Sequence, residues 1–528
     1  MPKPFRYAAD FVKGSLVAYP VLLAIFPVLF LWSHNIGTLP TASLPDIVLP
    51  TAVSGGATMM LTVLAGLVIR DMRKAGLVVS LFLMLFFFYG RTFDALLELD
   101  FLESLRQRYF LLACILLLGL AGFLILRSKA NLGKITYFLN VVSIVLVLSS
   151  AASIVIGELG TREASDGGTS LAALAGEGAL DARTTIEPAW KPDIYYIILD
   201  AHASSGYLER SLGYDDKRFF DYLAGKGFYV VEGGRSNYGN TTLSLASSLN
   251  MEHLIDLTVT PAEDSQDSSV YNEMIRENKV MKFLRSRGYQ MFHFKESWMP
   301  RAHEEYGDQY FGCGLGTLLY VWGGEFTSFL LQTTILEPVL RQSGLIASSY
   351  QSKGLCEIAR LLEVRKIHGP KFVYGHLSIP HPPFVFGRDG DLVDDASGSL
   401  TLWSSRQAYL NQMIFVDKKV EEIVEQILSG PGDPPVVIIQ ADHGTGFFGE
   451  GFSEEVYEER FSIINALYLP AGGEQDLYPS ITPVNSFRVV FNRYFDAGLK
   501  LEEDISYYTN FDEGWFNFLD VTDEAKLD

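Results

Sequence analysis

The chain has 528 residues, 48% of them hydrophobic, and it carries a formal net charge of −20 with only 42 Lys and Arg residues. This length exceeds that of one ordinary domain. An acidic chain without a basic tract is poorly suited to binding nucleic acid, so we expect no nucleic-acid partner.

Apolar residues are concentrated in the first 157 positions. Five stretches there are long enough to cross a bilayer, at residues 15–33, 48–69, 75–92, 109–126 and 136–157. None contains a central run of ionisable side chains, which favours an anchor over a proton or ion path. We therefore predict an α-helical membrane domain of five spans over residues 1–157.

Basic residues predict the orientation of these spans. Lys3, Arg6 and Lys13 precede the first span, whereas the loop after it has no Lys or Arg, and the loops after the second and fourth spans are basic. The positive-inside rule then puts the N-terminus in the cytoplasm. Five crossings of the inner (plasma) membrane place everything after residue 157 on the extracytoplasmic, periplasmic side.

A linker is predicted at residues 158–190, which are rich in Gly, Ala, Ser, Thr and Glu and lack sustained periodicity apart from a possible short helix around Leu171–Leu180. A soluble domain over residues 191–528 follows. Its two cysteines, Cys313 and Cys356, could form one disulfide in an extracytoplasmic compartment or could stay as two free thiols.

Nearly continuous apolar runs of strand length recur through the soluble domain, as expected of strands buried on both faces. They lie at residues 193–199, 228–231, 290–294, 372–377, 436–439 and 462–469. Helical patterns separate several of them, at residues 217–226, 280–287, 407–428 and 484–494. This alternation predicts an α/β domain with a mostly parallel sheet covered on both faces, in which ligands bind beyond the C-terminal ends of the strands.

Residues able to carry chemistry follow three of the predicted strands. Asp200 ends the first strand, His381 lies in Pro380-His381-Pro382-Pro383 after the run at 372–377, and Asp442-His443-Gly444 follows the run at 436–439. Each has a plainer alternative. An aspartate after a strand often caps the next helix, and Asp-His-Gly also occurs in ordinary turns.

A polar turn at residues 236–240 opens into a small-residue segment that begins with Thr241 and Thr242. A hydroxyl at a helix N-terminus lies beside unpaired N–H groups and the positive end of the helix dipole, which suits an oxygen nucleophile that approaches an anion. The alternative is that either threonine only caps the helix.

Two carboxylates, an imidazole and a hydroxyl together suit a divalent cation such as Mn²⁺, Zn²⁺ or Mg²⁺. Metal coordination activates a hydroxyl and neutralises charge on a phosphoryl oxygen. The set therefore predicts attack on a phosphate ester through a covalent phospho-threonine.

The motifs Ile197-Ile198-Leu199-Asp200, Thr241-x-x-Ser244, His376-x4-His381 and Asp442-His443-Gly444, in this order, resemble those of the alkaline phosphatase/sulfatase superfamily. With five spans ahead of the domain, the chain looks most similar to the lipoteichoic acid synthase and phosphoethanolamine transferase branches. The resemblance covers residues 191–470 in motifs and implies an alkaline phosphatase/sulfatase-like extracytoplasmic domain.

The resemblance also implies roles for individual residues. Asp200, Thr241, Asp442 and His443 would hold one divalent metal ion, with Asp200 standing where these transferases usually have Glu. Thr241 would be the nucleophile, because a serine three residues later recurs in the family and Ser244 matches it. His381 would contact the transferred phosphate or the leaving group.

Further substrate-binding candidates are His293, Trp298, Arg301, His376, Arg235 and Arg460. The first three are similar to a His…Trp-x-Arg stretch that binds the phosphoglycerol headgroup in lipoteichoic acid synthase, although the spacing differs, and packing with a surface charge is the alternative. His376 matches the first histidine of the paired motif or is a buried strand residue. The two remaining arginines could clamp phosphate.

Two departures from the family pattern narrow the chemistry. No histidine follows His443, so a downstream metal-site histidine of two-zinc relatives has no counterpart, which favours one metal ion. The chain also has no Cys-x-Pro-Ser-Arg, so the formylglycine of true sulfatases cannot form.

We expect a membrane-anchored transferase that moves a phosphorylated headgroup, of phosphoglycerol or phosphoethanolamine type, from a membrane phospholipid donor to an envelope glycan or lipid acceptor. One alternative is a phosphodiesterase or phosphatase of the same fold, with water as the acceptor. Another is a non-catalytic envelope assembly protein.

Overall fold

The computed structural model describes residues 16–35, 44–97, 107–166, 190–257, 268–294, 333–393, 405–430, 432–511 and 513–526, with isolated residues between these ranges. Two compact units divide the chain, and each is described by itself. One contains residues 1–163 and 316–346, and the other contains residues 164–315 and 347–528.

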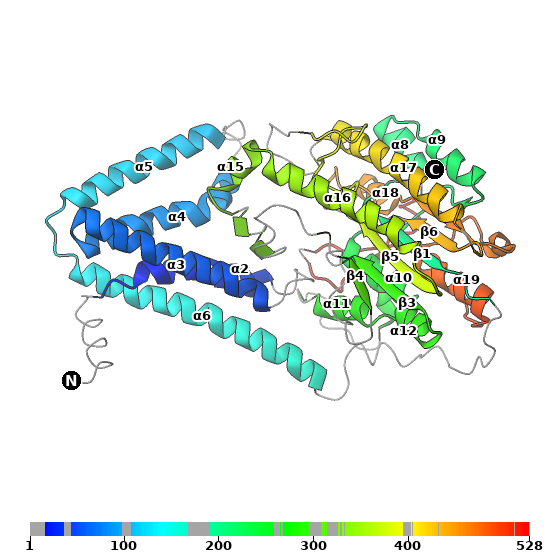
Figure 1. The fold of residues 1–528 in the computed structure, drawn as a ribbon, viewed down its shortest axis with the longest axis horizontal. Coiled ribbons are helices and arrows are strands. Elements are labelled where there is room, and N and C mark those ends of the chain that lie inside the picture. Colours follow the sequence, from blue (N-terminus) through cyan, green and yellow to red (C-terminus); the bar gives the residue numbers. More distant parts are fainter. Residues whose placement is uncertain are drawn as a thin grey trace. The chain divides into compact units, whose positions relative to one another are not determined.

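Long apolar helices form the first unit (Figure 1). They are α2 (Tyr19–Asn35), α3 (Leu44–Ile69), α4 (Met72–Leu97), α5 (Gln107–Arg127) and α6 (Gly133–Asp166), with the short α15 (Glu337–Gln342). Among the described residues, four segments are long and apolar enough to cross a membrane, namely Asp46–Ile69, Met72–Phe93, Arg108–Arg127 and Gly133–Ile156. The apolar helix Tyr19–His34 is shorter. The unit thus has four to five apolar candidate spans, as the sequence predicts.

Large apolar side chains stay exposed on this unit, which is typical of a surface that faces lipid rather than water. Examples are Leu67, Val68, Leu116, Phe138 and Leu148. One polar residue of α6, Asn140, is buried and forms hydrogen bonds with the backbone at the beginning of α2. Its Oδ1 accepts the Tyr19 N–H at 2.9 Å, and its Nδ2 donates to the Leu16 carbonyl at 2.7 Å. Asn140 therefore caps the beginning of α2.

A segment far along the chain also belongs to this unit. Phe326 is fully buried with its ring 5.0 Å from that of Trp32. The Gly90 N–H donates to the Thr333 carbonyl at 3.1 Å, and the Ile335 N–H donates to the Phe86 carbonyl at 2.9 Å. The sequence placed these residues within the soluble domain. The helix α6 continues to Asp166, across the start of the predicted linker, whereas the possible helix at 171–180 lies outside the described residues.

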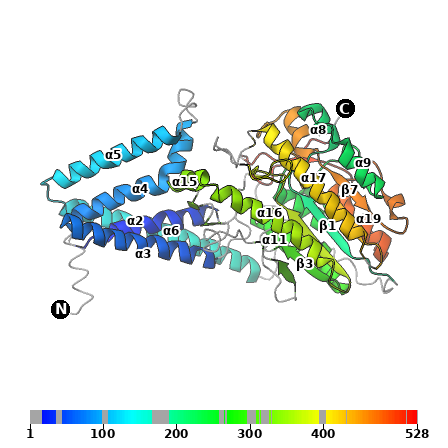
Figure 2. The ribbon, with the colours of Figure 1, turned by 45° about the horizontal axis from the view of Figure 1, so that its top comes forward.

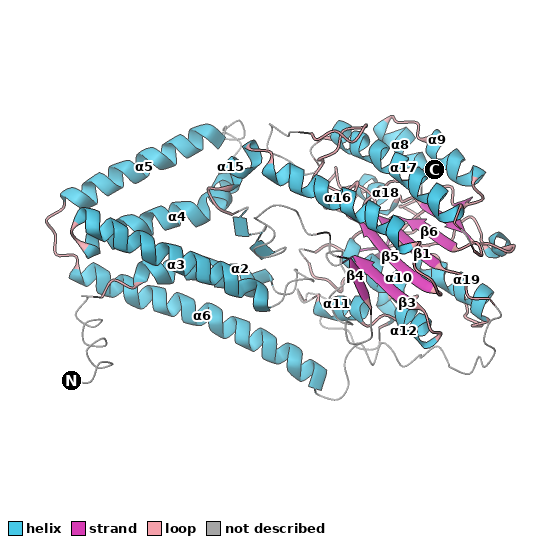
Figure 3. Ribbon diagram, viewed as in Figure 1, coloured by secondary structure: helices cyan, strands magenta, loops and turns pink. Residues whose placement is uncertain are grey.

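Strands form the centre of the second unit (Figure 3). Within the described residues, a seven-stranded sheet has the order β2-β7-β6-β1-β5-β3-β4. The strands are β1 (Ile194–Leu199), β2 (Tyr229–Val230), β3 (Gln290–Phe294), β4 (Gln309–Phe311), β5 (Lys371–Leu377), β6 (Val436–Gln440) and β7 (Asn465–Tyr468). β7 runs antiparallel to β2 and β6, and the other pairs are parallel. The prediction of a mostly parallel sheet is confirmed.

Helices cover both faces of the sheet (Figures 1 and 2). Ile194, Tyr196 and Ile198 of β1 share a buried core with α10 (Thr241–Asn250), α11 (Ser269–Arg276), α12 (Lys279–Ser286) and α19 (Pro483–Phe495). Side chains alternate along a strand, so the intervening residues face the opposite layer. The remaining helices are α8 (Ser205–Leu212), α9 (Lys217–Gly225), α16 (Leu345–Val364), α17 (Arg406–Leu428) and α18 (Glu454–Phe461), and β8 (Tyr507–Tyr508) pairs with β9 (Leu519–Asp520).

The cysteines of the soluble unit are joined. Cys313 and Cys356 form a disulfide with their Cα atoms 5.5 Å apart. This settles the alternative that the sequence left open, and it is consistent with an oxidising, extracytoplasmic compartment.

Candidate active site

The site lies where three neighbouring parallel strands end. β1 is the central strand, with β5 on one side and β6 on the other, and Ile198 is in register with both His376 and Gln440. The loops that follow these strands therefore begin at one edge of the sheet. The Asp200 N–H continues the ladder to the Leu377 carbonyl at 3.1 Å, and the His381 N–H donates to the Asp200 carbonyl at 3.0 Å.

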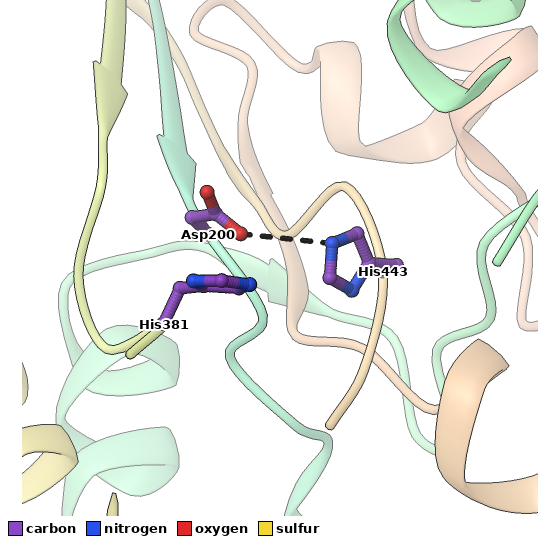
Figure 4. Close-up of side chains that lie close together, drawn as sticks. All are labelled: Asp200, His381 and His443. Carbon is purple, nitrogen blue, oxygen red and sulfur yellow. Dashed lines mark ion pairs between the residues drawn. The ribbon is translucent and has the colours of Figure 1, made fainter. Parts of the chain in front are cut away.

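Carboxylates and imidazoles converge at this edge (Figure 4). His443 Nε2 lies 3.6 Å from Asp200 Oδ1 and 3.7 Å from Asp442 Oδ2. His376 Nε2 approaches the same two residues, 3.5 Å from Asp200 Oδ2 and 4.0 Å from Asp442 Oδ2. Two groups of possible metal ligands result, and they share Asp200: one with His381 and His443, the other with His376 and Asp442.

Unpaired buried atoms show that this cluster fits a metal ion. Asp200 Oδ1, Asp442 Oδ2 and both ring nitrogens of His376 are buried without a hydrogen-bond partner among the described residues. Buried polar atoms nearly always have a hydrogen-bond partner, so several unpaired atoms in one cluster indicate that a ligand binds there. Imidazole and carboxylate groups suit a borderline or hard divalent cation.

Opposite charges within the cluster shift the pKa values of Asp200 and His376 so that each charged form is favoured. Burial raises the pKa of the Asp200 carboxyl, but the surrounding histidines, His381 first, outweigh burial and hold its pKa well below the ordinary value. Burial lowers the pKa of His376, yet Asp200 outweighs it, so the pKa of His376 lies above its usual value. Asp200 is therefore a carboxylate, the form that ligates a cation.

Backbone carbonyls orient two of the imidazoles. His443 Nδ1 lies 2.7 Å from the Gly444 carbonyl, and His381 Nδ1 lies 2.8 Å from the Pro382 carbonyl. A carbonyl only accepts, so each Nδ1 carries a proton and each Nε2 is free for the site. In Figure 4 both rings point toward Asp200. Such a second contact fixes the ring of a metal-ligating histidine.

The Asp442-His443-Gly444 loop is held against α18. The Gly444 N–H donates to the Arg460 carbonyl at 2.7 Å, and a Cβ at position 444 would collide with the Glu459 carbonyl oxygen. The buried Glu459 carboxylate accepts from the Thr445 hydroxyl at 2.7 Å and from two following N–H groups, those of Phe447 and Phe448. Glycine is therefore required where the loop approaches the helix most closely.

One buried side chain holds the loop that carries His381. Gln412 on α17 is completely buried, and its amide nitrogen Nε2 donates to the carbonyls of Pro380, His381 and Pro383. Its Oε1 accepts from the N–H groups of Val385 and Phe386. Gln412 fixes the loop through these bonds and does not itself reach the cluster.

Thr241 is the first residue of α10, and it is not the cap. Asn240 caps the helix, because its side chain accepts the Leu243 N–H at 2.9 Å. The capping alternative for the threonines is therefore wrong. Ser244 fixes the preceding turn by donating to the Tyr238 carbonyl at 2.8 Å. Among the described residues, no hydrogen bond occupies the Thr241 hydroxyl.

The beginning of α10 lies beside the Asp442-His443-Gly444 loop. A Cβ at Gly239 would lie 3.4 Å from the Cβ of Arg460, the residue whose carbonyl binds Gly444. Further along α10, Ser248 Oγ accepts from the Tyr196 hydroxyl of β1 at 3.4 Å. The turn before α10 and the Asp442-His443-Gly444 loop thus contact the same residue of α18, Arg460.

Other predicted substrate contacts have partners elsewhere. His293 Nε2 lies 3.2 Å from Asp308 Oδ2, Arg235 donates to the Thr522 carbonyl at 2.7 Å, and Arg460 pairs with Glu450 at 2.7 Å. Trp298 and Arg301 lie outside the described residues. The structure thus brings together Asp200, His376, His381, Asp442 and His443, with the start of α10 beside them.

Sequence reasoning missed the supporting residues. Gln412 and Glu459 sit in helices whose pattern shows only which face is apolar. The signal that could have identified them is a polar residue on the otherwise apolar face of a helix, which needs a hydrogen-bond partner inside the protein. His376 was predicted to bind substrate, and the structure adds it to the carboxylate cluster.

Comparison with known proteins is consistent with this fold. A model of the sulfatase family matches residues 192–489, more than half of the chain. No curated protein matched the sequence. One similar solved structure is the C-terminal periplasmic domain of EcEptC from Escherichia coli in complex with Zn, at 13% identity and a TM-score of 0.41, covering 64% of this chain and 94% of that one.

Two further solved structures are also similar to this chain. A protein in the alkaline phosphatase superfamily from Vibrio parahaemolyticus has 10% identity and a TM-score of 0.37, covering 65% of this chain and 81% of that one. The 2-O GAG sulfatase BT1596 has 14% identity and a TM-score of 0.39, covering 59% and 72%. Because the sulfatase family model matches residues 192–489, more than half of the chain, the chain belongs to the sulfatase family.

Proposed function

We propose that the protein transfers a phosphorylated headgroup from a membrane phospholipid, through a covalent intermediate on Thr241, to a glycan or lipid of the cell envelope. The observation that carries the proposal is the cluster of buried carboxylate and imidazole atoms without hydrogen-bond partners, together with a helix whose first residue, Thr241, has no hydrogen bond on its hydroxyl among the residues that the structure describes. Apolar candidate spans on the same chain would keep the enzyme at the membrane that holds its donor. Proximity then replaces a diffusive search.

Asp200, Asp442 and His443, with Thr241 and His376, would hold the divalent ion. When bound, the ion would stabilise an alkoxide at Thr241 and the charge that develops on the phosphoryl oxygens. The N-terminus of α10 adds its unpaired N–H groups and dipole, which favour an anion at this position.

The residues then have separate tasks in the first half-reaction. The Thr241 hydroxyl loses its proton to water, and its oxygen forms a bond to phosphorus. The bond from phosphorus to the diacylglycerol oxygen breaks. His381 enters this step doubly protonated: its Nδ1–H is held by the Pro382 carbonyl, and its Nε2–H donates a proton to the diacylglycerol oxygen, which leaves the ring neutral.

In the second half-reaction His381 accepts the proton of the acceptor hydroxyl. That oxygen attacks phosphorus, the bond from phosphorus to Thr241 breaks, and the Thr241 oxygen takes a proton back from water, which restores the hydroxyl. Residues of the acceptor site would decide between an envelope molecule and water.

A hydrolase is the second candidate, supported by the match to a family described as sulfatase. Hydrolysis of a phosphate ester fits the site better than hydrolysis of a sulfate ester. In the soluble unit Cys313 and Cys356 are joined, and the chain's one other cysteine is Cys114, in α5. No cysteine therefore stands ready to become formylglycine.

The test is a transfer assay with the full-length protein in vesicles that contain a phospholipid with a labelled headgroup. Envelope extract supplies the acceptor. We expect label in a glycan or lipid fraction with wild-type protein and none with Thr241→Ala, while the matched Thr242→Ala variant keeps activity. Release of free labelled headgroup phosphate would instead support the hydrolase. No turnover of any labelled lipid would contradict both.

A further inference from the structure

A second cluster of possible ligands lies in the soluble unit, apart from the site above. His202, Asp216 and Asp417 are all buried, and each offers a ligand atom within 4.8 Å of the other two. They come from three elements: the turn after β1, the residue before α9 and the middle of α17. The His202 ring lies 6.0 Å from that of Phe219 on α9.

The two ring nitrogens of His202 both face acceptor oxygens, but a neutral imidazole carries only one proton. Its Nδ1 lies 2.9 Å from the Ala203 carbonyl, so Nδ1 must carry a proton. Its Nε2 lies 2.8 Å from Asp417 Oδ1. In a neutral ring this contact would join a lone pair to a carboxylate oxygen. Such a contact requires either a further proton or a shared cation.

Two carboxylate oxygens also lack partners. Asp216 Oδ2 and Asp417 Oδ2 are buried without a hydrogen bond among the described residues. Asp216 precedes α9 but makes no side-chain capping bond. Each side chain is more than nine-tenths buried, so water does not solvate these atoms freely.

Charge around the cluster is also unbalanced. One imidazolium could neutralise only one of the two carboxylates. Arg218 is the nearby cation, but its largely exposed side chain pairs with Glu421 at 2.7 Å. Burial, with Asp417 next in importance, raises the pKa of Asp216 to about 9, and burial also raises the pKa of Asp417. His202 and Arg218 oppose these increases without overcoming them, so the two carboxylates have less positive charge nearby than their ionised forms would need.

We propose that His202, Asp216 and Asp417 bind a divalent cation of the Zn²⁺ class, separate from the ion of the active site. One imidazole and two carboxylates form a ligand set that suits Zn²⁺. The ion satisfies the lone pair of His202 Nε2 and the orphaned carboxylate oxygens at once. It ties the turn that carries Asp200 to α9 and α17, and α17 also carries Gln412, so its role is structural.

The test counts zinc in the full-length protein, purified in detergent, stripped with a chelator, dialysed against zinc and desalted. We expect Asp216→Asn to hold one zinc per chain fewer than wild type, and the exposed neighbour variant Asp215→Asn to match wild type. Asp442→Asn, in the active site, should lower the count separately, and the double variant should lose both amounts. Equal zinc content in wild type and Asp216→Asn would overturn the proposal.

A second measurement needs no substitution in the cluster, in case Asp216→Asn does not fold. Hydrogen exchange of the Asp442→Asn protein, with and without zinc, reports on α9, which carries no active-site residue. We expect zinc to slow exchange in α9 and in α17. Exchange in α9 that is unchanged by saturating zinc would show that the carboxylates share protons instead of a metal ion.

Discussion

His443 Nε2 lies 3.6 Å from Asp200 Oδ1, although the two residues follow different strands and are far apart in sequence. The contact exists because β1 and β6 are neighbours in a parallel sheet and end at the same edge. Asp200 Oδ1 has no hydrogen bond among the described residues, and 3.6 Å is longer than a hydrogen bond, so we interpret the two atoms as ligands of one cation.

Removing a ligand should release the metal. We predict that Asp200→Asn lowers zinc affinity about 100-fold or more, because loss of a direct ligand should exceed the usual effect of outer contacts. Competition with a chromogenic chelator measures this. Asp389→Asn, an exposed carboxylate paired with Lys418, is the control and should bind like wild type. Unaltered affinity in Asp200→Asn would exclude this residue as a ligand.

His381 can serve as a proton donor or as a ligand, and one variant separates these roles. For a proton donor, His381→Gln should lower kcat by about 10²- to 10⁴-fold while the metal content stays at the wild-type value. Turnover and metal content are measured on the same preparation. Loss of metal in His381→Gln would make this residue a ligand and would contradict the acid–base role.

Gln412 should act through position alone. Gln412→Leu removes five hydrogen bonds and leaves the N–H groups of Val385 and Phe386 buried without an acceptor, at a cost of about 2–4 kcal/mol in the free energy of unfolding. We predict a lower kcat with little change in KM, since the His381 loop loses its support. Gln407→Leu, an exposed position on the same helix, is the matched control. Equal kcat values in the two variants would refute the positioning role.

Asp308 offers a pH-dependent test of whether His293 is structural. Burial raises the pKa of Asp308, but bonds from His293 and Arg285 outweigh burial and lower it below the ordinary value. A lowered folded-state pKa contributes stability above the unfolded-state pKa of about 4, and that stability is lost as the pH falls through the folded-state pKa. We predict that Asp308→Asn costs about 1–3 kcal/mol at pH 7.

The same variant should differ least from wild type at pH values below the folded-state pKa of Asp308, because both proteins then lack the carboxylate. Unfolding of the two proteins by denaturant at several pH values measures the difference. A constant difference across that range would indicate packing rather than charge. Substrate affinity should not change if His293 serves only this ion pair.

The sheet was largely predictable because its central strands are buried on both faces and read as continuous apolar runs. β1, β5 and β6 were all placed within a residue or two, and with them Asp200, His381 and Asp442. The short β4 (Gln309–Phe311) was not predicted, since three residues give no periodicity. The antiparallel direction of β7 depends on long-range pairing, which an apolar run does not encode.

The contacts of individual side chains were harder to predict from the sequence than the strands were. Arg235 and Arg460 have the right chemistry for phosphate, but the structure pairs them with the Thr522 carbonyl and with Glu450. His202 was not singled out, because one of its ligand-like neighbours, Asp417 in α17, lies 215 residues further along the chain. A sequence shows residue types, whereas a ligand set depends on which distant helices the fold brings together.

Mass spectrometry of the peptide that carries Thr241 tests the central claim most directly. The protein would be purified from its own membranes and quenched rapidly in acid after a short exposure to labelled phospholipid. We predict an added mass on Thr241 equal to the phosphorylated headgroup, absent in Thr241→Ala and retained in Thr242→Ala. Label transfer to the acceptor at an undiminished rate by Thr241→Ala would contradict the covalent mechanism.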